Sequence, residues 1–120
     1  MYEHKLPFIE EKFSGWPRII QHLVGVAEIL KERGAPEYLQ IAGLYHSIYG
    51  EAMSGNFGYG LITREELINQ IGKQSEEVVH SWCELSEQTR ELGIEKIKDA
   101  QLKKDLYEIH TANEKEMKRA

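Results

Sequence analysis

The chain has 120 residues and a formal net charge of −5, which predicts one domain over residues 1–120. The negative charge argues against nucleic acid as a partner, and the single cysteine, Cys83, excludes an internal disulfide. Because no apolar run approaches the roughly 20 residues of a membrane helix and no signal peptide is recognisable, we expect a cytoplasmic protein without a membrane partner.

The first half of the chain predicts two long helices. Residues 1–13 are weakly patterned and are expected to form a short helix or a lid over the core. A helix is predicted from about Arg18 to Arg33, where apolar residues recur with helical period, and Gly34 suits the position just after its end. A second helix is predicted from about Pro36 to Tyr49. Its Gly43 costs helix propensity, so we expect a close helix contact there.

The second half predicts shorter helices. Residues 50–61 contain several glycines without periodicity and are expected to form a loop. Thr63 begins a capping box that predicts a helix start, Ser75 is expected to cap the next helix, and a last helix begins at about Lys96. The charged residues 114–120 are expected to fray. No strand is convincing, so the predicted fold class is a compact all-α bundle of five or six helices.

Two histidines fall on the inner faces of the first two long helices. His22 lies early on the first of these helices, and His46 lies near the end of the second. Imidazole is the commonest metal ligand in proteins, and two imidazoles with one or two carboxylates form an ordinary catalytic metal site. The residue after His46 is Ser47, however, which brings no charge to such a site. The pair therefore predicts either a metal site completed elsewhere or two packed core histidines.

The segment from Gln21 to Glu51, QHLVGVAEILKERGAPEYLQIAGLYHSIYGE, resembles the HD-domain superfamily of metal-dependent phosphohydrolases. Within it, the likeness is closest to RelA/SpoT-type (p)ppGpp hydrolase domains, and the pattern HSIYG is also similar to a group of small HD-like proteins. The resemblance implies an HD-like bundle in which His22 and His46 hold a metal. It also implies that Ser47 and Asn113 stand where the family has its two metal-binding aspartates.

The same resemblance implies a metal-dependent hydrolase of a small phosphate-containing or related metabolite. Its cofactor would be Mn, Fe or Zn, and Glu51 would activate water. The residues expected to contact this small-molecule ligand are Arg18, Tyr45, Ser47, Tyr49 and Tyr59. Replacing two aspartates by neutral residues removes two negative charges, so affinity for a hard cation is expected to fall sharply.

Two alternatives follow from that loss of charge. In the first, the chain is a catalytically inactive HD relative without a metal that binds a small ligand or a partner protein, and His22, His46, Ser47 and Asn113 hydrogen-bond one another. In the second, it is an HD-type iron oxygenase that recruits a further ligand such as His80. His4 and His110 are expected to face solvent. The sequence leaves the substrate and the oligomeric state open.

Overall fold

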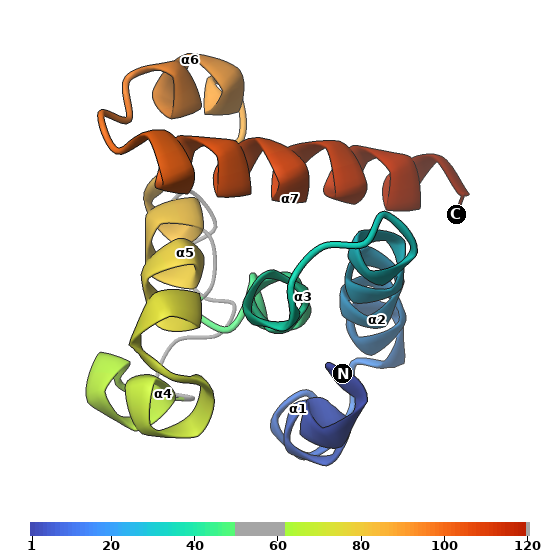
Figure 1. The fold of residues 1–120 in the computed structure, drawn as a ribbon. Helices are drawn as coiled ribbons and strands as arrows, with labels where there is room; N and C mark the ends of the chain where they lie inside the picture. Colours follow the sequence, from blue (N-terminus) through green and yellow to red (C-terminus); the bar gives the residue numbers. More distant parts are fainter. Residues whose placement is uncertain (50–61, 120) are drawn as a thin grey trace.

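The fold is all-helical in a computed structural model that describes residues 1–49 and 62–119 (Figure 1). The described part contains one 3₁₀ helix and seven α-helices, compared with the five or six helices predicted. None of the helices in these two ranges is both long and apolar enough to cross a membrane. In chain order the elements are η1 (Glu3–Lys5), α1 (Leu6–Lys12), α2 (Pro17–Glu32), α3 (Glu37–Tyr45), α4 (Arg64–Ile71), α5 (Lys73–Glu84), α6 (Arg90–Glu95) and α7 (Ala100–Arg119).

Helix α3 forms the centre of the core and lies between α2 and α5 (Figure 1). Every residue from Leu39 to Tyr45 is buried, as expected for a helix that has neighbours all round. The long helix α7 crosses the ends of α2 and α5, and α6 packs on its opposite side (Figure 1). The sides of α2, α3, α5 and α7 that meet at this crossing enclose the histidine pair.

Gly43 lets α3 approach α2 closely. A Cβ atom at this position would lie 2.5 Å from Cδ1 of Leu30 and 3.3 Å from Cγ1 of Val26. The first of these distances is impossible for real atoms, so a side chain at position 43 would force the two helices apart or displace Leu30. The close helix contact predicted at Gly43 is confirmed.

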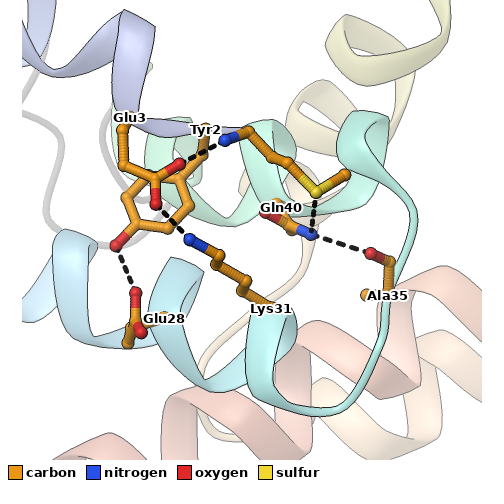
Figure 2. Close-up of polar contacts among 7 residues, drawn as sticks. Tyr2, Glu3, Glu28, Lys31, Ala35 and Gln40 are labelled. Carbon is orange, nitrogen blue, oxygen red and sulfur yellow. Dashed lines mark hydrogen bonds and ion pairs between the residues drawn. The ribbon is translucent and has the colours of Figure 1, made fainter.

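The N-terminal segment packs against the core and is tied to α2 and α3 by polar contacts (Figure 2). The hydroxyl group of buried Tyr2 donates a hydrogen bond to Oε2 of Glu28 at 2.6 Å, and Lys31 forms an ion pair with Glu3. Nε2 of Gln40, on α3, contacts Sδ of Met1 at 3.7 Å and donates to the backbone carbonyl of Ala35 at 2.8 Å. The first residues therefore cover the core, and η1 and α1 supply the short helix predicted for residues 1–13.

Helix α3 is shorter than predicted. It ends at Tyr45 rather than Tyr49, and His46 is its C-terminal cap. The backbone N–H of His46 reaches the carbonyl of Gly43 at 3.5 Å, whereas its side-chain Nδ1 makes a 2.6 Å hydrogen bond to the same oxygen. The imidazole thus competes with the backbone for that acceptor, and the chain tightens into a turn.

Two further boundaries differ from the prediction. Ser75 does not cap α5, because the helix begins at Lys73 with Gly72 as its cap, and the buried Ser75 hydroxyl donates to the carbonyl of Tyr38 instead. The residues predicted to fray continue α7 as far as Arg119. The capping box at Thr63 is confirmed, since its hydroxyl accepts from the backbone N–H of Glu66 at 3.1 Å.

Candidate functional site

A pocket of about 400 Å³ opens where α2, α5 and α7 meet the end of α3. It brings together five residues that the sequence predicts as ligands or binding residues, although they come from three separate parts of the chain. These are Arg18, His22, His46, Ser47 and Asn113. The rest of its lining consists of Ile19, Trp82, Glu87, Arg90 and Met117.

Both ring nitrogens of His22 contact oxygen atoms from α7. Nε2 lies 2.8 Å from Oδ1 of Asn113, and Nδ1 pairs with a carboxylate oxygen of Glu116. Gly25 makes room for this carboxylate, because a Cβ there would lie 2.6 Å from Cγ of Glu116. A ring that donates from both nitrogens is an imidazolium, so this arrangement suits the charged form of His22.

His46 is buried and neutral. It is only 3% exposed, and its ring packs edge-on against those of His22 and Trp82 at centroid distances of 5.3 and 5.7 Å. Burial lowers the pKa of His46 to about 4, and the positive charges of His22 and Arg90 act in the same direction. Because Nδ1 faces the carbonyl of Gly43, the neutral ring carries its proton on Nδ1 and keeps Nε2 as an acceptor.

Asn113 connects the two histidines. Its Oδ1 accepts from Nε2 of His22 at 2.8 Å, and its proximity to His46 raises the pKa of that ring against the larger effect of burial. The approach of the two imidazoles predicted from the sequence is therefore confirmed, and so is a hydrogen bond between His22 and Asn113. The amide nitrogen of Asn113 donates to Sδ of Met117 at 3.7 Å.

This donor set does not fit a tightly held divalent cation. Ser47 and Asn113 are neutral, and both nitrogens of His22 already face oxygen acceptors. Glu116 brings a carboxylate to the histidine pair, but it forms an ion pair with His22. Among the described residues, no three His, Cys, Asp or Glu side chains of this pocket bring their ligand atoms together.

Arg90 adds positive charge to the pocket, and sequence reasoning did not identify it. Its guanidinium lies over the Trp82 ring, 4.2 Å from the centroid, which favours a fixed position by a cation–π interaction. Its Nε atom is buried without a hydrogen-bond partner in the part of the chain described. Arg90 begins the six-residue helix α6, so no helical periodicity in the sequence links it to the histidines.

Three other candidates lie elsewhere in the structure. Tyr45 is fully buried and stacks against Phe8, so the expectation that it contacts a ligand is wrong for this pocket. The hydroxyl of Tyr49 donates to buried Glu76 at 2.7 Å, which gives it a structural partner on α5. His80 packs against the Tyr49 ring and pairs with Glu84, so it is not brought to the histidine pair.

Two candidates, Glu51 and Tyr59, lie outside the described residues. Their predicted roles, water activation and ligand contact, therefore stay predictions. The same holds for the predicted loop over residues 50–61.

The prediction that His110 faces solvent is wrong, whereas His4 is exposed as expected. His110 is 8% exposed on α7, and its Nε2 atom points at the carboxylates of Glu91 and Glu114. The spacing of His110 and Glu114, four residues apart on one helix, is visible in the sequence. The proximity of Glu91 to these two residues is not visible in the sequence, because Glu91 comes from α6 and is brought to them only by the fold.

Comparison with known proteins gives one family. Searches of curated proteins and of solved structures found no match. Residues 15–86, more than half of the chain, match the model of the family described as Domain of unknown function (DUF6817). The matched range includes α2 to α5, and so His22, His46 and Ser47, whereas Arg90 and Asn113 follow it. The chain belongs to this family, Domain of unknown function (DUF6817).

Proposed function

We propose that the histidine pocket binds a small phosphate-containing metabolite without a tightly held divalent metal. The observation that carries this proposal is Arg90, which lines the pocket with a fixed guanidinium and a buried Nε donor that lacks a partner among the described residues. A buried donor without an acceptor costs free energy, and an anionic oxygen is its strongest partner. In a chain of net charge −5, cations gathered at one pocket favour an anion locally.

The other lining residues suit the same ligand. Arg18 is exposed at the pocket, and His22 has the hydrogen-bond pattern of an imidazolium. Ser47 adds a hydroxyl group that can donate to a phosphate oxygen. Glu87 also lines the pocket and repels anions, so it offsets part of the positive charge there. The sequence resemblance to HD phosphohydrolases supports this ligand class.

The experiment is a thermal-shift titration with inorganic pyrophosphate in the presence of EDTA. A ligand that binds only the folded chain stabilises it by about 2.7 kcal/mol at 100 times its Kd, so Tm should rise with concentration. The rise should be lost in Arg90→Gln and retained in Arg33→Gln, which removes the same charge at the C-terminal end of α2, outside the histidine pocket. Equal shifts in both variants would contradict the proposal.

Metal-dependent hydrolysis of such a metabolite is the second candidate. It is supported by the approach of His22 and His46, whose ring centroids lie 5.3 Å apart, since the HD resemblance implies that these two histidines lie together. It requires a metal that the described donors fit poorly, so little Mn²⁺ or Mg²⁺ should accompany the purified protein. Ser47→Asp with Asn113→Asp should restore metal affinity if these positions correspond to the HD aspartates, and each single change should restore less.

Calorimetric titration of Mn²⁺ into wild type and double variant separates these candidates. Stoichiometric tight Mn²⁺ and phosphatase activity in the wild type would favour hydrolysis, with Glu51 the first residue to test as an additional ligand. We do not retain the iron oxygenase as a leading candidate, since His80, its expected extra ligand, lies against Tyr49 and Glu84.

A further inference from the structure

Three side chains of types that can ligate a metal meet between α6 and α7, and none of them lines the histidine pocket. Glu91 comes from α6, and His110 and Glu114 come from successive turns of α7. One ligand atom from each residue lies within 4.8 Å of the other two. We propose that these three residues bind a zinc-like divalent cation.

The distances within the cluster suit a tetrahedral ion. His110 Nε2 lies 3.2 Å from Oε1 of Glu91 and 3.6 Å from Oε1 of Glu114. Zinc bonds to nitrogen and oxygen of about 2.0–2.1 Å place neighbouring tetrahedral ligands about 3.3 Å apart. A cation can therefore enter between the three atoms with small side-chain rotations. One imidazole and two carboxylates leave a fourth position for water.

The orientation of the His110 ring is the second observation that points to a ligand. The residue is 8% exposed, and its Nε2 atom is directed at two carboxylates that are themselves exposed. Nδ1 is buried without a hydrogen-bond partner in the described chain. An imidazole can offset at most one of the two carboxylate charges, whereas a divalent cation would offset both and use the Nε2 lone pair.

Such an ion would join α6 to α7. Helix α6 has only six residues, which is too short to be stable by itself, and its first residue is Arg90 of the histidine pocket. A cation held by Glu91 would fix the start of α6 against α7. The cation would contribute to the stability of this corner, and the inference does not depend on what the histidine pocket binds.

The test is a calorimetric and thermal-shift titration of tag-free protein with Zn²⁺. We expect one site per chain and a rise in Tm with zinc concentration. Glu91→Gln and Glu114→Gln should each weaken zinc binding by about tenfold or more, because each removes one charged ligand from the ion. Both carboxylates are largely exposed, with side-chain exposures of 73% and 54%, so the variants should fold.

Two control variants exclude other zinc sites. Glu84→Gln alters the pair of His80 and Glu84, which has the same spacing on α5 and a 3.2 Å contact, and it should leave zinc affinity unchanged. His22→Gln removes an imidazole from the histidine pocket and should also leave it unchanged. The inference would be overturned by absence of zinc binding, by full binding in both Glu91→Gln and Glu114→Gln, or by loss of binding in His22→Gln.

Discussion

Acidification tests the neutral, buried state of His46. An unfolded histidine has a pKa near 6.5, whereas burial lowers the pKa of folded His46 to about 4. The unfolded chain therefore binds more protons between these two values, and the free energy of unfolding should fall as pH decreases from 6.5 to 4. At about 1.36 kcal/mol per pH unit, the contribution of His46 amounts to about 3 kcal/mol. Below pH 4 His46 is protonated in both the folded and the unfolded chain, so its contribution does not increase further.

The assay is urea unfolding of wild type and His46→Asn at intervals between pH 7.5 and 4. The asparagine amide can still donate to the carbonyl of Gly43 but does not titrate, so the variant should be less stable at pH 7 and lose less stability on acidification. The difference between the two curves isolates His46 from the carboxylates that also protonate. Parallel curves would refute the reasoning, as would an NMR titration of wild-type His46 with a midpoint near 6.5.

Three stability predictions follow from other contacts. Glu76→Gln should lower the free energy of unfolding by about 1–3 kcal/mol, since the buried carboxylate accepts two hydrogen bonds from Arg64 at 2.8 and 2.9 Å and Arg64 is half exposed. Gly43→Ala should destabilise by up to about 2 kcal/mol, because overpacking against Leu30 outweighs the gain of about 1 kcal/mol in helix propensity. Thr63→Ala should cost about 1 kcal/mol by removing the cap of α4. Chemical denaturation measures all three, and an unchanged unfolding midpoint would contradict the prediction concerned.

Local sequence signals predicted most of the fold. Helical periodicity and Gly34 located α2, the capping box located the start of α4, and Gly43 indicated the close contact of α2 with α3. The errors arose where tertiary contacts determine local structure. Serine is a common helix cap, but the hydroxyl of Ser75 donates to the carbonyl of Tyr38 instead. The imidazole of His46 ends α3 early by hydrogen-bonding to the carbonyl of Gly43.

The candidate site was predictable only in part. Sequence reasoning and the family resemblance identified five of its residues, and the structure brings them together: Arg18, His22, His46, Ser47 and Asn113. Arg90 could not be identified by periodicity, whereas Glu116 follows Asn113 by three residues on the same face of α7 but was not singled out. Arg90 begins a short helix that is placed by its packing against α7, and Glu116 reaches His22 because Gly25 leaves room on the facing helix.

The histidine ring signals in an NMR titration with inorganic pyrophosphate test the central claim most directly. His22 and His46 line the proposed binding pocket, whereas His4 and His80 lie outside it. With EDTA present, the account predicts that pyrophosphate shifts the His22 and His46 signals in a saturable manner and leaves those of His4 and His80 unchanged. Equal small shifts of all four rings, or a response of His22 and His46 that requires added Mn²⁺, would contradict it.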